Sequence, residues 1–321
     1  MNAPKPGTNR QAQHLLHTAF YRFVHLPDPE AAARELRQIG GALGLRGSLV
    51  VAHEGVNGMV AGAAALVRQF EEAVGSGAVL KGLLRDLCFK RSVCASQPFG
   101  RLKVSVKPEI VTLGLPLPAA EPHSALPDAH DASHLLPAAW REMLAQGTAV
   151  VLDNRNHFEF RLGHFRGAVD PGVHHFRDLV RFVEQHAPAW RAQGRPVAMY
   201  CTGGIRCDKT APWMRTLGLE IFQLDGGILN YLQHARVHDR DDGHDRAVPL
   251  GGAGVLQRDR PGRQRSDPLD DWQGECFVFD RRIALDAHLC EAATTAEQVF
   301  DPAHPDEAWR LQRALRLDDA P

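Results

Sequence analysis

The sequence predicts two consecutive domains of mixed helix and strand, one of the α+β class and one of the α/β class, followed by a C-terminal extension. Short strands and helices alternate along residues 18–115, and a second alternating series spans residues 136–236. The chain of 321 residues also exceeds a typical single domain of ~100–200 residues. The remaining segments are expected to be a disordered N-terminus (1–17), a linker (116–135) and a partly flexible C-terminal extension (237–321).

The first domain is predicted to be a small sandwich of two helices on a sheet. Phe20 begins a β-rich run, Asp28 is placed to cap a helix that ends near Leu43, and Asn57-Gly58 is typical of a hairpin turn. The expected strands are residues 20–24, 47–52, 59–61, 84–89 and 102–106, and the expected helices are residues 28–43 and 63–74. The βαββαβ order is typical of a ferredoxin-like split βαβ fold.

The second domain is predicted to have a parallel sheet. Prolines are frequent in residues 115–137, as in a linker, and near-continuous apolar strands follow them. Such strands are typical of parallel sheets that helices cover on both faces. The expected strands are residues 149–153, 196–201 and 220–224, and the expected helices are residues 176–186 and 208–217.

The C-terminal extension has little regular patterning. Residues 251–267 are rich in Gly and Arg and are expected to be flexible, whereas residues 272–285 regain order with a strand at 277–279. The His- and Asp-rich run 238–245 lacks the spacing of a calcium loop, so we interpret it as a solvated charged loop.

The composition excludes several classes of protein. Hydrophobic residues at 44% and charged residues at 23% indicate a globular chain, and a net charge of −1 argues against a uniformly basic surface. No secretory or membrane-spanning segment is expected, because the N-terminus is polar and no apolar stretch reaches ~20 residues. The six cysteines include no Cys-x-x-Cys pair, which predicts free thiols in the cytoplasm and no metal site.

The strongest chemical signal is Cys201-Thr202-Gly203-Gly204-Ile205-Arg206-Cys207. A buried strand ends at the first cysteine, two glycines allow a tight turn, and a helix follows. Backbone amides in such a turn form an anion-binding nest, which stabilises a thiolate and lowers its pKa below ~8.5. Arg206 adds a permanent positive charge. The alternative is a buried structural cysteine on a Gly-rich connection.

This loop resembles the active-site loop of a rhodanese domain, as do residues 153–155, 163–168 and 225–228. The resemblance implies that Cys201 carries a persulfide or another reactive sulfur. The loop places four residues between Cys201 and Arg206, whereas related cysteine phosphatases have five and usually place a histidine before the cysteine, where this chain has Tyr200. The shorter loop favours sulfur chemistry over phosphate chemistry.

The resemblance extends over residues 18–285 to the rhodanese-containing tRNA uridine 5-hydroxylase family. It rests on the motifs at residues 21–23, 52–58, 89–90, 98–104, 109–114, 201–209 and 272–280. It implies oxygen-dependent conversion of the wobble uridine (position 34) to 5-hydroxyuridine, with the tRNA anticodon loop as partner, molecular oxygen as co-substrate and no evident cofactor. The catalytic residues implied are Cys201 and Arg206, with the loop residues Thr202, Gly203, Gly204, Ile205 and Cys207, and with Asp153 and Arg155 in support.

An RNA substrate also fits the charge pattern of the first domain. Seven basic residues lie in residues 81–107 against one acidic residue, Asp86, and phenylalanines lie among them. Basic side chains neutralise phosphates and aromatic faces stack on unpaired bases, although a solvated basic hairpin is the alternative. The RNA-binding candidates are Lys90, Arg91, Arg101, Lys103, Glu54 and Asn57, of which the last two could instead shape a hairpin. No DNA or membrane partner is expected.

Three functions remain open at this point. The first is uridine hydroxylation, in which the Cys201 thiolate adds to uracil C6 and makes C5 electron-rich. The second is a sulfurtransferase with a persulfide on Cys201, and the third is a non-catalytic RNA-binding scaffold. Cys207 is either a resolving thiol or a small residue at the helix start.

Overall fold

The computed structural model describes residues 15–115, 132–241 and 268–318. The first domain is a five-stranded sheet in the order β4-β1-β3-β2-β5, in which β5 runs parallel to β2 and the other pairs are antiparallel. The elements are β1 (Leu15–Phe23), α1 (Pro29–Ala42), β2 (Arg46–Ala52), β3 (Gly55–Ala63), α2 (Ala64–Gly75), η1 (Leu80–Gly82), β4 (Lys90–Cys94) and β5 (Leu102–Val106). The order β4-β1-β3-β2 confirms the ferredoxin-like fold, and β5 extends it by one edge strand.

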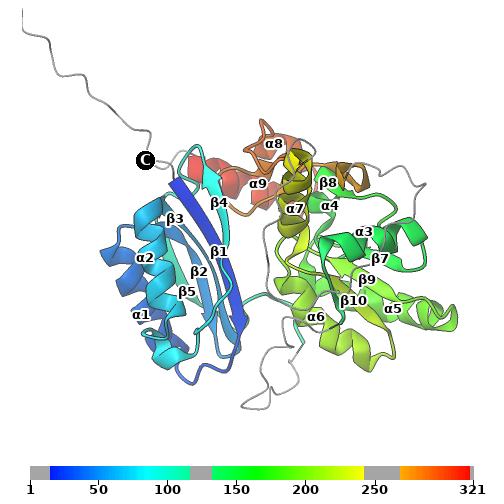
Figure 1. Ribbon diagram of the computed structural model, residues 1–321, viewed down its shortest axis with the longest axis horizontal. Coiled ribbons are helices and arrows are strands. Elements are labelled where there is room, and N and C mark those ends of the chain that lie inside the picture. The colour runs from blue at the N-terminus through cyan, green and yellow to red at the C-terminus, as the bar shows by residue number, and fades with distance from the viewer. Residues whose placement is uncertain (1–14, 116–131, 242–267, 319–321) are drawn as a thin grey trace, which may run out of the picture.

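The two faces of this sheet have different roles. Leu16 and Phe20 of β1 pack into the core with residues of α1 and α2, whereas His17 and Tyr21 belong to the opposite face, because side chains alternate along a strand. Figure 1 shows α1 and α2 on the outer side of the sheet and β1 on the side of the second domain. One face of the sheet is therefore directed at the rest of the chain.

Local predictions for the first domain have mixed outcomes. Asp28 does cap α1, since its side chain accepts from the Ala31 backbone N–H at 2.8 Å. The strand predicted at residues 84–89 is wrong, because Leu84 and Leu87 fill the core from an irregular turn. The Asn57-Gly58 turn is also wrong: both residues lie inside β3, and residues 53–54 make the turn.

The second domain is built on the parallel sheet β6-β10-β9-β7. Its elements are β6 (His134–Leu135), α3 (Pro137–Gln146), β7 (Val150–Asp153), α4 (His157–Leu162), β8 (Gly163–Phe165), η2 (Phe176–Asp178), α5 (Leu179–Ala192), β9 (Val197–Tyr200), α6 (Ile205–Thr216), β10 (Ile221–Leu224) and α7 (Gly227–Asp241). Two buried clusters, one with α5 and α6 and one with α3 and α7, cover the two faces of the sheet. This confirms the predicted α/β domain, although α6 begins three residues before the expected position 208.

The boundaries of the expected disordered and linker segments shift in the structure. Leu15 and His17 already belong to β1, and His134 belongs to β6. The predicted flexible segment 251–267 lies outside the described residues, and the charged run 238–245 lies partly in α7 and partly outside them.

The C-terminal extension joins the two domains. Its elements are η3 (Pro268–Asp271), β11 (Trp272–Gly274), β12 (Cys276–Phe277), β13 (Ala284–Leu285), α8 (Ala296–Val299) and α9 (Pro305–Asp318). β11 pairs with β8 of the second domain, while Arg282 donates to Cys94 Sγ of the first domain at 3.3 Å. The strand expected at 277–279 is replaced by β12, which ends at Phe277. Figure 1 shows α8 and α9 beside both domains. Within the described ranges no helix is sufficiently long and apolar to cross a bilayer.

Candidate active site

The Cys201 loop begins where β9 ends and closes where α6 starts. Gly204 caps α6 with φ of 100°, a conformation that side chains other than glycine rarely adopt. In this turn the Gly204 backbone N–H donates to Cys201 Sγ at 3.1 Å. The predicted anion nest is therefore formed, and it is occupied by the sulfur of the chain itself.

The start of α7 holds the loop from its other side. The backbone N–H groups of Ile228 and Leu229 donate to the carbonyl oxygens of Cys201 and Thr202 at 3.0 and 3.1 Å. Gly227 has φ of 70°, and a Cβ at this position would overlap the Cys201 carbonyl oxygen. The glycines of residues 225–228 thus permit two backbones to approach closely.

The environment of Cys201 favours its thiolate. Burial alone would raise the thiol pKa, but the Cys207 thiol, the Arg206 charge and the backbone N–H groups of both residues lower the pKa of Cys201 to about 5. Cys207 has the opposite behaviour, because burial and its hydrogen bond to Cys201 raise its pKa well above the ordinary value. Cys207 therefore acts as a proton-bearing donor to the Cys201 thiolate.

Arg206 is neutralised by a residue that the sequence analysis missed. Its two terminal nitrogens each donate to a carboxylate oxygen of Glu159 at 2.7 Å, and both side chains are buried. Burial would raise the pKa of Glu159, but Arg206 lowers it, so the pair is ionised. Asn156 and Glu159 also form a capping box on α4. This Asn-x-x-Glu pattern is visible in the sequence, but its link to Arg206 is not.

Asp153 and Arg155 form a support layer behind the loop. The Arg155 guanidinium donates to both carboxylate oxygens of Asp153 at 2.8 and 2.7 Å, and the Tyr200 hydroxyl donates to Asp153 at 2.7 Å. Asn154 donates to Thr210 at 2.8 Å and approaches Cys207 Sγ at 3.7 Å. Tyr200, the residue before Cys201, therefore anchors the end of β9 to this layer.

Cys201 is covered in this structure, with a relative exposure of 1%. Part of the cover comes from the first domain. The Tyr21 hydroxyl donates to Asp208 of α6 at 2.7 Å, and a Cβ on Gly204 would lie 2.8 Å from the same hydroxyl oxygen. The Lys90 ammonium donates to the Gly203 carbonyl and lies 3.4 Å from the Gly226 carbonyl. In this closed arrangement the Cys201 sulfur is therefore shielded from solvent by residues of both domains.

An ion cluster around the buried Lys209 side chain holds the same interface together. Lys209 of α6 donates to Glu54, at 2.8 and 3.0 Å, and to Glu109. Glu54 also accepts from the Ile110 backbone N–H at 2.7 Å, and Asn57 donates to the Ile110 carbonyl at 3.2 Å. Glu54 and Asn57 thus make contacts within the protein here, although the Asn57-Gly58 hairpin turn proposed for them is not formed.

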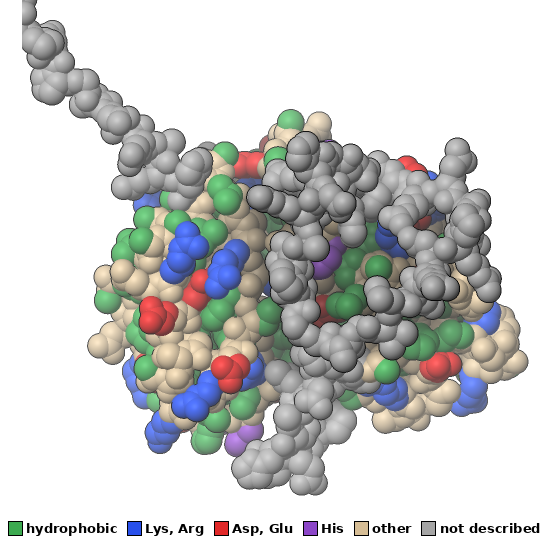
Figure 2. Space-filling view, viewed as in Figure 1, with side chains coloured by type: hydrophobic (Ala, Val, Ile, Leu, Met, Phe, Trp, Pro, Cys, Tyr) green, Lys and Arg blue, Asp and Glu red, His purple; other side chains and the backbone are tan. Residues whose placement is uncertain are grey.

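The structure does not gather the basic RNA-binding candidates into one patch. Lys90 and Arg91 are neighbours on β4 but point to opposite faces, so Lys90 meets the Cys201 loop while Arg91 pairs with Glu71 of α2 at 2.9 Å. Arg101 and Lys103 are exposed at the other edge of the sheet, on or next to β5. Figure 2 shows basic side chains interspersed with acidic ones on the visible face of the first domain.

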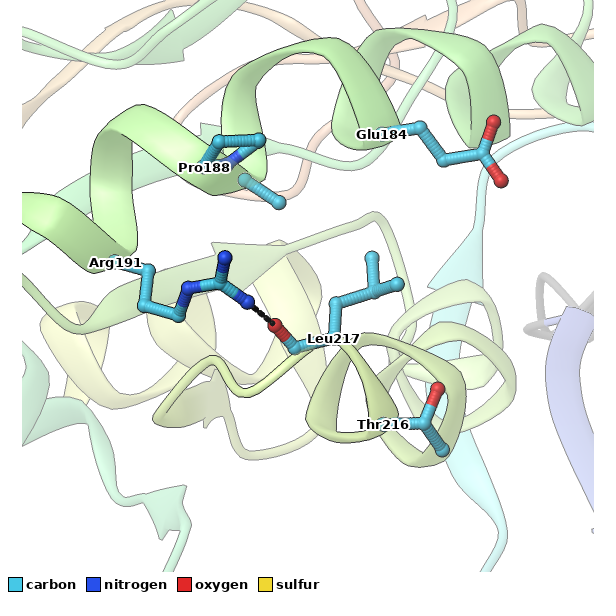
Figure 3. Close-up of a pocket in the computed structure, with 6 residues that line it drawn as sticks. Glu184, Pro188, Arg191, Thr216 and Leu217 are labelled. Carbon is cyan, nitrogen blue, oxygen red and sulfur yellow. Dashed lines mark hydrogen bonds between the residues drawn. The ribbon is translucent and has the colours of Figure 1, made fainter.

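Other features of the described chain do not add a site. No group of His, Cys, Asp and Glu among the described residues is arranged to hold a metal ion. A shallow hollow between α5 and the end of α6 is lined by Glu184, Ala187, Pro188, Arg191, Thr216 and Leu217 (Figure 3). It lies at the opposite end of the 12-residue helix from Cys201, about 16 Å along the axis.

The comparisons with known proteins agree with this architecture. Residues 15–110 match the UPF0176 acylphosphatase like domain, and residues 136–234 match the rhodanese-like domain. Proteins named tRNA uridine(34) hydroxylase are similar over most of the chain. The one from Deinococcus radiodurans is 36% identical over 89% of this chain and 83% of its own length. Those from Nitrobacter winogradskyi and Bradyrhizobium diazoefficiens are 36% and 38% identical, over 90% and 85% of this chain and 98% and 92% of their own lengths. The chain belongs to the tRNA uridine(34) hydroxylase family.

Proposed function

We propose that this protein hydroxylates C5 of the wobble uridine of tRNA, with molecular oxygen as co-substrate and Cys201 as nucleophile. The observation that carries the proposal is the amide-lined Cys201 thiolate, with a pKa of about 5, in a chain of this family. A thiol with this pKa is ionised at neutral pH and is ready to attack an electrophilic carbon.

The proposed chemistry returns Cys201 to its starting state. The thiolate adds to uracil C6, and the electron pair displaced to C5 takes up one oxygen atom. Loss of the C5 proton then expels the thiolate and restores the ring double bond. The second atom of molecular oxygen leaves as water, with two electrons and two protons from an external reductant. Arg206 and Cys207 stabilise the thiolate before it adds and after it leaves.

Substrate entry requires the two domains to separate at the Cys201 loop. The contacts of Tyr21 and Lys90 with the loop region are polar and partly exposed to solvent. Contacts of this kind are easier to break than the buried Lys209 cluster at the same interface, because water replaces the broken hydrogen bonds. We propose that the anticodon loop of a cytoplasmic tRNA enters between the domains and takes the place of these contacts.

The test is to analyse tRNA nucleosides from cells in which Cys201 is replaced by serine. We expect Cys201→Ser to abolish 5-hydroxyuridine at the wobble position, because a hydroxyl is not ionised at neutral pH. Cys290→Ser, which changes an exposed cysteine, is the matched control and should leave the modification intact.

The alternative functions give different results in the same experiment. Normal 5-hydroxyuridine with Cys201→Ser would contradict the proposed role of the thiolate. If the modification also persists in a deletion strain while the purified protein transfers sulfur from thiosulfate to cyanide, the protein is a sulfurtransferase instead.

A further inference from the structure

Phe279 is an exposed aromatic side chain beside the Cys201 loop. Its relative exposure is 49%, and its ring centroid lies 5.8 Å from the guanidinium carbon of Arg206. Phe176, which is buried, lies 5.9 Å from the same guanidinium. Arg206 thus lies close to two rings, of which Phe279 has half of its surface in solvent.

The position of Phe279 is set by contacts on both sides of it in the chain. Phe277, two residues before, is buried in the core and meets the Phe279 ring edge-to-face with centroids 5.0 Å apart. Asp280 and Arg282, just after it, form a buried ion pair that contacts Cys94 of the first domain. The ring is therefore presented by an ordered backbone, although it is not itself enclosed.

The backbone after Phe279 carries a further arginine, Arg281, which contacts the first domain. The Arg281 backbone N–H donates to the Pro98 carbonyl at 3.1 Å, and a Cβ on Gly100 would lie 2.9 Å from an Arg281 guanidinium nitrogen. These contacts bring Pro98 and Gly100 to the segment that carries Phe279, and the exposed Arg101 follows Gly100 in the chain. An exposed aromatic ring with arginines at it and near it in the chain is a combination with which proteins bind unpaired nucleotides.

We propose that Phe279 stacks on an unpaired nucleobase of the anticodon loop, while Arg101 contacts the adjacent phosphate. This inference rests on the proposed function, because it supplies the RNA contact that holds the target uridine near Cys201. Among the basic candidates it gives this phosphate contact to Arg101, because Arg101 is exposed and follows Gly100, which contacts Arg281.

The test measures binding of a synthetic anticodon stem-loop with uridine at the wobble position to the full-length chain by fluorescence anisotropy. We expect Phe279→Ala and Phe279→Leu each to weaken binding about 10-fold, with no change in the salt dependence, because no phosphate contact is lost. Phe279→Trp should retain binding. Arg101→Ala should weaken binding and lower the slope of log Kd against log salt by about 0.7, as expected for one phosphate contact.

The matched control is Trp309→Ala, which removes the exposed aromatic ring of α9 that faces Arg313. It should leave binding unchanged. Unchanged binding with Phe279→Ala would overturn the proposal. Full retention of stem-loop binding by Phe279→Leu would also overturn it, because an apolar side chain without an aromatic face would then be sufficient. The titration midpoint of the Cys201 thiolate, followed by absorbance at 240 nm, should be the same in Phe279→Leu as in the wild type. A shifted midpoint would show that the Phe279 ring acts on the charge of Arg206 rather than on RNA.

The experiment separates this inference from the proposed function. If the wild-type chain binds the stem-loop through Phe279 but forms no 5-hydroxyuridine in cells, the stacking contact stands and the hydroxylase proposal fails. If Cys201→Ser abolishes the modification while Phe279→Ala leaves RNA binding and the modification unchanged, only the stacking contact is refuted.

Discussion

Cys207 illustrates how one buried side chain controls another. Its thiol donates to Cys201, which lowers the pKa of Cys201 and raises its own. A thiol with a raised pKa is a poor nucleophile at neutral pH, so the structure favours a hydrogen-bonding role for Cys207 over that of a resolving thiol.

Replacing Cys207 with alanine should raise the pKa of Cys201 by about 1–2 units, because a hydrogen bond to a charged group is lost. Thiolate absorbance at 240 nm against pH measures this midpoint. Cys207→Ser keeps a donor and should shift it less, so equal shifts in both variants would contradict the proposed donor role.

The lowered pKa of Cys201 also makes the stability of the folded chain depend on pH. Its pKa is about 5 in the folded chain against a reference value of 9.0. The thiolate contribution to the free energy of unfolding is therefore complete above pH ~9 and is lost as the pH falls towards 5. Cys207→Ala should reduce this thiolate contribution to the free energy of unfolding, because it raises the pKa of Cys201 in the folded chain.

At the scale of elements, Lys209 ties α6 to the first domain. Its side chain is fully buried against Glu54 and Glu109, and the latter has its pKa lowered by Lys209 and by the backbone N–H groups of Leu113 and Gly114, against the effect of burial. Removing the ammonium would leave two partly buried carboxylates close together with no cation between them. Breaking a buried pair in this way is costly, because burial disfavours an uncompensated charge.

Lys209→Met should lower the free energy of unfolding by about 3–5 kcal/mol, as measured by urea denaturation. The triple variant Glu54→Gln/Glu109→Gln/Lys209→Met should recover much of this loss, since no charge stays unpaired. Lys103→Met, at an exposed position, is the control. A loss below about 1 kcal/mol for Lys209→Met would contradict the role of the cluster.

At the scale of the whole molecule, the first domain both completes and closes the Cys201 site. Tyr21 and Lys90 come from neighbouring strands of one sheet and meet the loop from the same face. If the domains separate at this loop to admit the substrate, as we propose, the reactivity of the Cys201 thiolate should report on that separation.

We expect Tyr21→Phe/Lys90→Met to raise the alkylation rate of Cys201 by iodoacetamide about tenfold, because the interdomain hydrogen bonds of both side chains are lost. The measurement is made at pH 8, where Cys201 is ionised, in a Cys88→Ser/Cys290→Ser background that removes the exposed thiols. Arg91→Met is the control, because Arg91 lies next to Lys90 on β4 but points to the opposite face of the sheet. An unchanged rate in the double variant would show that these contacts do not gate the sulfur.

The errors of sequence interpretation share one cause. Leu84 and Leu87 looked like a strand because they are apolar, and the Asn57-Gly58 pair looked like a turn because of its residue types. In both cases the packing of a neighbouring element, rather than local preference, decided the conformation. Basic residues 90 and 91 were grouped by spacing, although strand alternation separates them.

The sequence alone determined the features that depend on local backbone chemistry and burial. These are the split βαβ order, the parallel sheet, the Asp28 cap and the Cys201 turn with its glycines. The tertiary structure alone decided which charges meet: Glu159 with Arg206, Lys209 with Glu54, and Lys90 with the loop carbonyls. The partners in these pairs are separated by 47, 155 and 113 positions in the chain. A residue pattern specifies the face on which a side chain lies, but the element packed against that face is selected by the whole fold.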